Sequence, residues 1–280
     1  MDYQLAFGLG TALYSTSRGQ RDDNIVSMTR LAIQHGYRHL DGAELYNNEE
    51  ELGEAVRASG IPREKLFVVT KLCGTEKRDI QAEFVNSLAR LGLDFIDLYL
   101  VHGPYMANNA KELQQVWSQM EAIKRSGKAR SIGVSNFLQE HIEAILQTAE
   151  IPPAVNSIEY HPYLQRGTLI DFLRAHGIAV SAYSVLTALT EGCPGPVDGL
   201  YTELAKKYSV SEASIALKWC IDQGIAAVTT SRNPQRVKEY LEDLQMFKLT
   251  PDEIEKISME GKKKHYRKFL TDRFAPDDRR

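Results

Sequence analysis

The chain has 280 residues, of which 43% are hydrophobic and 25% are charged, and its formal net charge is −3 at neutral pH. These values are ordinary for a globular protein with a substantial core, and they exclude the strongly basic composition that favours nucleic acids or anionic membranes. No apolar run approaches the ~18 residues of a membrane helix, and residues 1–4 carry no targeting pattern.

Short β-branched runs alternate with longer amphipathic segments along the chain. The predicted strands are residues 5–10, 38–41, 66–71, 95–101, 130–134, 154–159, 179–183 and 226–230. The predicted helices are residues 23–36, 49–60, 79–91, 110–127, 138–149, 167–176, 200–208, 211–221 and 234–244. Eight strands, each followed by a helix, in about 240 residues favour an α/β fold of the closed (β/α)₈ TIM barrel type over an open sheet.

We expect a single domain over residues 1–280, because no low-complexity linker divides the chain. An additional C-terminal helix begins at Thr250, where Thr is a good N-cap and Pro251 suits the first helical position. The tail over residues 262–280 is charged but contains three aromatic residues. Two interpretations stay open: a solvated terminus, or a segment that packs on the barrel as one wall of a pocket.

The cysteines are Cys73, Cys193 and Cys220, and they form neither a CxxC pair nor a zinc spacing. We therefore expect reduced thiols in a cytoplasmic protein. The strand-end histidines lack the cluster of carboxylates or further histidines that a catalytic metal needs, so no metal site is predicted.

Polar side chains recur at the carboxyl ends of the predicted strands, where TIM barrels carry their functional groups. A single such residue is more often structural, but packing alone does not explain a polar group at this end of so many strands. The set comprises Asp41 with Tyr46 just beyond it, Lys71, His102, Ser135, Asn136, Glu159, His161, Tyr183, Ser184, Thr230 and Ser231.

Several of these residues lie in longer motifs: HLDGAELYNNE at residues 39–49, VTK at 69–71, VH at 101–102, IGVSNF at 132–137 and EYHP at 159–162. With these motifs the chain resembles the aldo-keto reductase superfamily over nearly its whole length. VTTS at residues 228–231 and the basic, aromatic tail are most similar to fungal conjugated-polyketone and ketopantoyl-lactone reductases.

The resemblance implies a reductase of ketones or aldehydes whose catalytic set is Asp41, Tyr46, Lys71 and His102. Ketone reduction needs a hydride on carbon and a proton on oxygen, and free tyrosine is a weak acid with a pKa of about 10. We expect the Lys71 ammonium, oriented by Asp41, to lower the pKa of Tyr46 towards neutral pH. His102 would act as a neutral donor that holds the substrate oxygen.

The resemblance also implies NADPH as the cofactor, which would supply the hydride. Gly8 and Gly10 form a GxG that lacks the third glycine of a Rossmann fingerprint. Nicotinamide would stack on Tyr183, and Arg236 is the candidate contact for the 2′-phosphate. The full set implied for the cofactor is Thr11, Asp41, Ser135, Asn136, Ser157, Tyr183, Ser184, Leu186, Thr229, Thr230, Ser231, Arg232, Arg236, Glu239 and Tyr240.

The chain departs from the family pattern at two places in the expected cofactor site. Thr229 and Thr230 replace a common proline and lysine, which leaves Arg232 to compensate for the missing cation. Ser157 replaces a glutamine that bonds the carboxamide. Both departures bear on how strictly NADPH is preferred over NADH.

On the substrate side, the implied contacts are Tyr46, His102, Ala12, Cys73 and Gly103. The last three replace aromatic positions of sugar- and aldehyde-reducing relatives, so we expect a wide pocket for a bulky or cyclic ketone, a dicarbonyl or a ketolactone. The irregular loop over residues 190–199 is expected to lie over the cofactor. We expect a monomer or weak dimer whose partner is a small carbonyl compound, without nucleic acid or membrane.

Two alternative functions stay open. One is a reductase of C=N bonds, because an imine is more basic than a ketone and demands less of Tyr46. The other is a catalytically silent nucleotide-binding regulatory protein, against which the intact set of four catalytic residues argues.

Overall fold

A computed structural model describes residues 4–16, 19–74 and 78–280 of the chain. Residues 1–3, for which no targeting pattern was predicted, lie outside the described residues. The strands are β1 (Leu5–Gly8), β2 (His39–Asp41), β3 (Phe67–Leu72), β4 (Ile96–Val101), β5 (Ala129–Ser135), β6 (Val155–Glu159), β7 (Ala179–Tyr183) and β8 (Ala226–Thr229). They pair in parallel in chain order, and β8 pairs with β1, so the sheet is a closed barrel. The predicted (β/α)₈ TIM barrel is confirmed.

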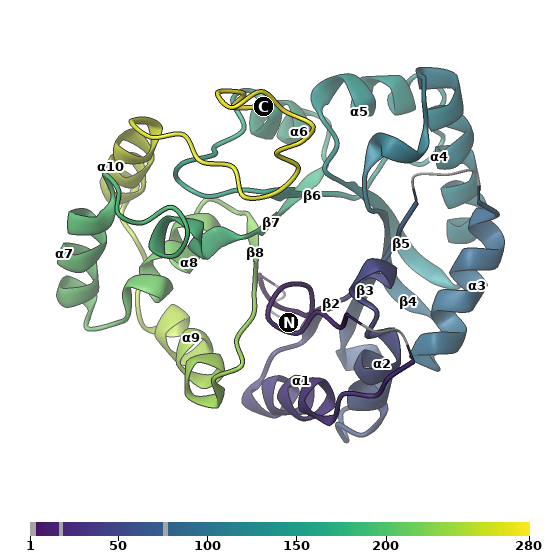
Figure 1. The fold of residues 1–280 in the computed structure, drawn as a ribbon, viewed down its shortest axis with the longest axis horizontal. Helices are drawn as coiled ribbons and strands as arrows, with labels where there is room; N and C mark the ends of the chain where they lie inside the picture. The colour runs from purple at the N-terminus through teal and green to yellow at the C-terminus, as the bar shows by residue number, and fades with distance from the viewer. Residues whose placement is uncertain (1–3, 17–18, 75–77) are drawn as a thin grey trace.

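The helices surround the barrel as an outer ring (Figure 1). They are α1 (Asp23–His35), α2 (Glu49–Arg57), α3 (Ile80–Leu91), α4 (Ala110–Arg125), α5 (Gln139–Leu146), α6 (Leu169–Ala175), α7 (Asp198–Tyr208), α8 (Glu212–Ile221), α9 (Pro234–Met246) and α10 (Pro251–Lys262). As predicted, two helices separate the last two strands, and Thr250 caps the additional helix α10 through a hydrogen bond from Glu253 N–H. None of the helices among the described residues is both long and apolar enough to cross a membrane.

Element ends differ from the predictions by a few residues, for local reasons. The first strand stops at Gly8 rather than at residue 10, and the helix predicted over residues 110–127 stops at Arg125. Gly127 has φ +78°, in the left-handed region that glycine adopts without strain. Because this conformation is not helical, Gly127 lies after the end of α4 and is not part of its last turn. At the start of α1, the Asp22 carboxylate accepts a hydrogen bond from Asn24 N–H at 2.9 Å.

The apolar residues of each strand divide between two cores. All six residues of β4 are buried, because both faces of a TIM-barrel strand are covered. Leu98 and Leu100 pack inside the barrel with Val69, whereas Tyr99 and Val101 pack in the larger core between strands and helices. Burial of one such side chain contributes roughly 1.5–3 kcal/mol. The barrel is therefore a filled scaffold, and open space is left at its end.

The tail after α10 crosses the barrel end near β6 and β7, as the yellow segment in Figure 1 shows. Tyr266 N–H donates to Tyr163 O at 3.2 Å, so the tail is attached to the loop that follows β6. Phe269 and Leu270 line the cavity described below. Of the two interpretations of the tail, the structure supports the packed wall.

Candidate active site

A cavity of about 680 Å³ opens at the carboxyl ends of the barrel strands. This is the end at which TIM barrels carry their functional loops. Its walls come from strand ends, from the loops after β1, β3, β4 and β7, and from the C-terminal tail. The described residues that line it are Gly8, Gly10, Thr11, Tyr14, Asp41, Tyr46, Lys71, Cys73, Gly74, His102, Gly103, Tyr105, Ser135, Asn136, Ser157, Tyr183, Ser184, Val185, Leu186, Thr187, Thr190, Glu191, Val228, Thr229, Thr230, Lys268, Phe269 and Leu270.

Lys71 is the centre of a buried polar cluster in this cavity. Its ammonium donates to Asp41 Oδ1 at 2.6 Å, to Gly42 O at 2.8 Å and to Tyr46 OH at 3.3 Å. Asp41 is in register with Val69, and Lys71 follows two residues later, so both side chains lie on the same side of the sheet. The Lys71 and Asp41 side chains are 3% and 8% exposed, so the ion pair is almost fully removed from water.

Burial is the largest influence on Tyr46, and it raises the pKa of the hydroxyl above its ordinary value, although Lys71 acts in the opposite direction. The expectation that the pKa of Tyr46 falls towards neutral was therefore wrong in its net direction. Burial acts to lower the pKa of Lys71, but Asp41 and Tyr46 together hold it above its ordinary value. At neutral pH the cluster thus presents a protonated phenol beside an ammonium.

His102 follows β4 and lies beside Tyr46. The two rings meet edge to face, with centroids 5.6 Å apart and planes at 80°. Burial, and then the Lys71 charge, lowers the pKa of His102 to about 3. Its Nδ1 is buried without a hydrogen-bond partner among the described residues. A neutral imidazole has one N–H donor and one acceptor nitrogen, so His102 can donate to a polar group in the cavity.

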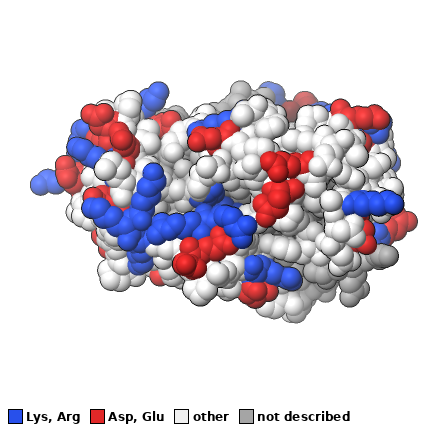
Figure 2. All heavy atoms as spheres, turned by 90° about the horizontal axis from the view of Figure 1, so that it is seen from above, with Lys and Arg blue, Asp and Glu red and all other residues white. Residues whose placement is uncertain are grey.

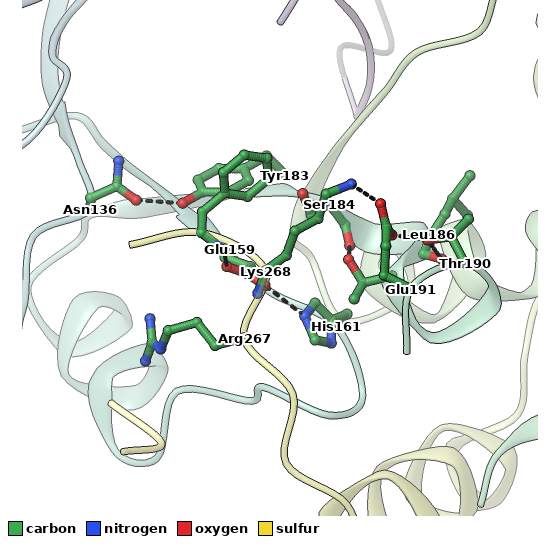
Figure 3. Close-up of polar contacts among 12 residues, drawn as sticks. Asn136, Glu159, His161, Tyr183, Ser184, Leu186, Thr190, Glu191, Arg267 and Lys268 are labelled. Atoms are coloured by element: carbon green, nitrogen blue, oxygen red, sulfur yellow. Dashed lines mark hydrogen bonds and ion pairs between the residues drawn. The ribbon is translucent and has the colours of Figure 1, made fainter. Parts of the chain in front are cut away.

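Tyr183, Asn136 and Ser135 form a hydrogen-bonded row along the cavity. Tyr183 OH donates to Asn136 Oδ1 at 2.6 Å, as Figure 3 shows, and Asn136 Nδ2 donates to His102 O at 2.9 Å and to Ser135 Oγ at 3.1 Å. Ser135 Oγ in turn donates to Ser157 O at 2.8 Å. These bonds use both amide hydrogens and the Ser135 hydroxyl hydrogen. Any further hydrogen bond to Asn136 Oδ1 or Ser135 Oγ must therefore be one that these oxygens accept.

The buried Glu159 carboxylate anchors the tail (Figure 3). Its two oxygens accept Lys268 N–H at 2.7 Å and Phe269 N–H at 3.0 Å, and His161 Nε2 lies 3.0 Å from Oε1. Burial acts to raise the pKa of Glu159, but the bonds from His161 and the tail hold it below its ordinary value. Anchored in this way, the Phe269 ring lies edge-on to Tyr183 at 5.8 Å and closes one side of the cavity.

The loop after β7 is joined to the same tail. Lys268 Nζ lies 2.5 Å from Glu191 Oε1, and both residues line the cavity (Figure 3). Lys264 Nζ also donates to the carbonyls of Gly192 and Pro194. Burial acts to raise the pKa of Glu191, but hydrogen bonds, first from Lys268, lower it to about 2. The irregular loop thus borders the cavity and is bound to the tail by side-chain contacts.

The structure brings together most of the residues expected to hold the cofactor. Ten of them line the cavity: Thr11, Asp41, Ser135, Asn136, Ser157, Tyr183, Ser184, Leu186, Thr229 and Thr230. The other five, Ser231, Arg232, Arg236, Glu239 and Tyr240, lie beyond its lining, on the loop after β8 and on α9. Arg236 is exposed, whereas Tyr240 is 5% exposed. Arg232 Nε donates to Ala12 O and so links this loop to the loop after β1.

On the substrate side, Tyr46, His102, Cys73 and Gly103 line the cavity, whereas Ala12 does not. An aromatic wall is nevertheless present, supplied by residues that the sequence analysis did not include. A Cβ on Gly103 would lie 3.0 Å from the Tyr105 ring, so Tyr105 occupies the space next to this glycine. Tyr105 lies only two residues after Gly103, where relatives carry an aromatic residue, and this proximity was the signal that could have identified it.

The tail residues Lys268, Phe269 and Leu270 and the loop residue Glu191 were also not among the predicted site residues. The adjacent apolar pair at 269–270 within a charged tail was the available signal, since a solvated terminus rarely needs one. Its contact with Glu159 was not predictable from spacing, because Glu159 and Phe269 are 110 positions apart.

Comparison with known proteins agrees with this geometry. The model of the Aldo/keto reductase family matches residues 6–259. An NAD/NADP-dependent indole-3-acetaldehyde reductase of Schizosaccharomyces pombe is 36% identical, over 95% of this chain and 94% of that protein. An NADPH-dependent alpha-keto amide reductase of Saccharomyces cerevisiae is 38% identical, over 91% of this chain and 85% of that protein.

Solved structures agree as well. A crystal structure of a Bombyx mori aldo-keto reductase in complex with NADP has a TM-score of 0.81 at 35% identity and covers 91% of this chain and 88% of that one. The region matched by the family model includes β1 from Ala6 onward, strands β2 to β8 in full and the cavity cluster around Lys71. The predicted resemblance is confirmed: the chain belongs to the aldo/keto reductase family of oxidoreductases.

Proposed function

We propose that this protein reduces a ketone or aldehyde with NADPH, with Tyr46 as the proton donor. The observation that carries the proposal is the contact of the Tyr46 hydroxyl with the buried Lys71–Asp41 pair, beside a neutral His102. NADPH, when bound, would supply the hydride. The protein's own task is then to deliver a proton to the carbonyl oxygen and to hold both reactants.

The electrostatics of the cluster suit proton donation. The raised pKa of Tyr46 keeps its proton in place at neutral pH, so the donor is available in each cycle. As the proton leaves, negative charge develops on the phenol oxygen, and the Lys71 ammonium 3.3 Å away stabilises it. Asp41 keeps Lys71 charged and directed at Tyr46. His102, neutral above about pH 3, is positioned to donate to the carbonyl oxygen.

The cavity residues fit a nicotinamide cofactor. Asn136 Oδ1 and Ser135 Oγ retain acceptor capacity, which matches a carboxamide NH₂ group, while Tyr183 provides a flat aromatic face. Thr229 and Thr230 also line the cavity, and their buried hydroxyls have no partner among the described residues. For the NADPH preference we rely on Arg232, in the loop before α9, and on Arg236, in its first turn; both lie beyond the lining of the cavity.

For the substrate we propose a bulky or cyclic ketone, dicarbonyl or ketolactone. Small residues at Cys73 and Gly103 leave room beside the catalytic cluster, and Tyr105 and Phe269 offer apolar surfaces to a ring. We also propose that the whole chain acts as one domain, as a monomer or weak dimer. The three free thiols favour a reducing compartment such as the cytoplasm.

The test is NADPH oxidation with isatin, a ketolactone, an aromatic aldehyde, xylose and a cyclic imine. We expect isatin and the ketolactone to give the highest kcat/KM, and Tyr46→Phe to lower kcat by about 10²–10⁴ while NADPH affinity is kept. The matched control is Tyr37→Phe, because the Tyr37 hydroxyl is buried without a partner and lies outside the cavity.

The other outcomes separate the alternatives. Turnover of the imine alone would favour C=N reduction. NADPH binding without any turnover would favour a regulatory protein. Substantial activity in Tyr46→Phe would contradict the proposed proton donor, and faster turnover of xylose than of isatin would contradict the proposed substrate class.

A further inference from the structure

The Tyr105 ring of the cavity wall owes its place to Gly103. Tyr105 belongs to a short 3₁₀ turn, Pro104–Met106, that follows β4. Gly103 has φ −170° and ψ 160°, an extended conformation that any residue adopts, so the backbone does not require glycine here. A Cβ at this position would lie 3.0 Å from the Tyr105 ring, which is closer than a van der Waals contact. The glycine therefore makes room for the ring beside the cavity.

A cation of the C-terminal tail holds the same ring. The tail is rich in Lys and Arg, and Figure 2, a view of the edge with α6 and the tail, shows such side chains gathered on part of this face. Arg273 is set apart from an ordinary surface charge because its guanidinium carbon lies over the Tyr105 ring, 4.8 Å from the centroid. The negative face of an aromatic ring attracts a guanidinium at this distance. Burial raises the pKa of Tyr105, and among the charges that act in the opposite direction that of Arg273 has the largest effect.

A tight turn joins Arg273 to the cavity wall. Arg273 N–H donates to Leu270 O at 2.9 Å, and Leu270 lines the cavity next to Phe269. Leu270 has φ +59°, a left-handed conformation that leucine rarely adopts and that persists only where its surroundings hold it. Before the turn, Phe269 N–H is bound by Glu159. After the turn, Arg273 lies on Tyr105. The tail is thus fixed at two points, one at the end of β6 and one on the loop after β4.

We propose that Arg273 is a positioning residue through which the enzyme favours flat cyclic substrates. The proposal rests on the proposed carbonyl reduction. With Arg273 over its face, Tyr105 keeps one orientation, and the loop after β4 and the tail together present the rings of Tyr105 and Phe269 to the substrate. A flat ring gains most from aromatic surfaces that are already held in place, because their orientation need not be fixed on binding. A short open-chain aldehyde covers little of either ring and gains less.

The exposed carboxylate beside Arg273 does not account for this arrangement. Arg273 Nε lies 3.3 Å from Asp272 Oδ2, and the two side chains are 48% and 75% exposed. Ion pairs so open to water contribute little. We therefore expect Asp272→Asn to bind a cyclic ketone like the wild type, whereas a change at Arg273 should not.

The test compares isatin with propanal in Arg273→Gln and Arg273→Lys. Calorimetry in the presence of NADP⁺, which allows no reduction, gives the Kd of isatin, and NADPH oxidation gives KM and kcat for both compounds. Arg273→Gln should raise the Kd and KM of isatin about two- to fivefold, and the KM of propanal less. Arg273→Lys keeps a cation near the ring and should stay close to the wild type.

The matched control is Arg130→Gln. The Arg130 guanidinium also lies over an aromatic ring, 4.0 Å from the centroid of Phe95, and its side chain is likewise 48% exposed. Neither residue lines the cavity, so this variant should bind isatin like the wild type. Thermal unfolding of each variant shows that it is folded at the assay temperature.

Tyr105→Leu removes the ring on which Arg273 lies, so adding Arg273→Gln to it should change the Kd of isatin no further. The proposal would be overturned by an unchanged Kd in Arg273→Gln, by the same rise in the Tyr105→Leu background, by an equal effect on propanal, or by a loss that lysine does not restore. Failure of wild-type protein to bind isatin would overturn it as well. Because the Kd needs no turnover, these results are distinct from a failure of the proposed proton donor, which full activity of Tyr46→Phe would reveal.

Discussion

Asp41→Asn tests whether the buried ion pair is needed to keep Lys71 charged inside the barrel. The substitution keeps the size of the side chain but leaves the Lys71 ammonium, 3% exposed, without its counter-charge. Loss of one partner of a buried pair costs about 3–5 kcal/mol. Lys71 retains Gly42 O at 2.8 Å and Tyr46 OH at 3.3 Å, so we expect the lower end, about 3 kcal/mol. For a chain of this size that corresponds to a fall in Tm of roughly 6–12 °C.

The assay combines thermal unfolding with NADPH-dependent ketone reduction for Asp41→Asn, Lys71→Met and the double variant. We expect the double variant to recover most of the lost Tm, because both buried charges are gone, but to remain inactive, because Tyr46 lacks its ammonium. Glu150→Gln breaks an exposed ion pair and should leave Tm unchanged. An Asp41→Asn variant that unfolds within a degree of the wild type would contradict the role given to the buried ion pair. Wild-type ketone reduction by the double variant would do the same for the role of Lys71.

Three further predictions concern His102, Arg236 and the tail. The pKa of His102 is about 3 and that of Tyr46 lies above its ordinary value, so kcat/KM for reduction should stay flat between about pH 5 and 8. It should fall only as rising pH deprotonates Tyr46. A step near pH 6.5 would show that His102 titrates there. Arg236→Gln should raise KM for NADPH about tenfold and leave KM for NADH unchanged, and an equal rise for both would remove Arg236 from 2′-phosphate recognition. Phe269→Ala should raise KM for a cyclic ketone more than for a small aldehyde. Glu159→Gln should have the same effect, because it weakens the bonds that hold the tail. Unchanged KM values in both variants would show that the tail does not contact the substrate.

The strand order and the buried polar cluster were predictable because both depend on local pattern. A strand that is covered on both faces has a continuous apolar run, and the polar residue that follows such a run marks its carboxyl end. Lys71 and His102 each follow runs of this kind, and the structure places both in the cavity. Element ends were less accurate, because a glycine such as Gly127 can end a helix or follow it by a residue or two.

The direction of the pKa shift at Tyr46 was not predictable from residue types. The nearby charge, Lys71, and the sign of its effect on the pKa of Tyr46 agree with the prediction. Burial of the hydroxyl has the opposite sign and is larger, and it depends on how completely the surrounding loops and tail cover the site. The extent of this burial follows from tertiary packing, which no sequence motif of the chain predicts.

Glu159 has one property that was predictable from local sequence and one that depends on tertiary packing. Its place at the end of β6 was predictable, and the EYHP motif that contains it contributed to the family resemblance. Its partners are backbone N–H groups of residues 109 and 110 positions away, so composition and spacing could not identify them. Because those bonds fix Phe269 against Tyr183, one strand-end carboxylate links the Tyr183 side of the cavity, which we propose for the cofactor, to the Phe269 side, which we propose for the substrate. We therefore expect changes in the tail sequence to alter this wall of the cavity while the Asp41–Lys71–Tyr46 cluster stays as it is.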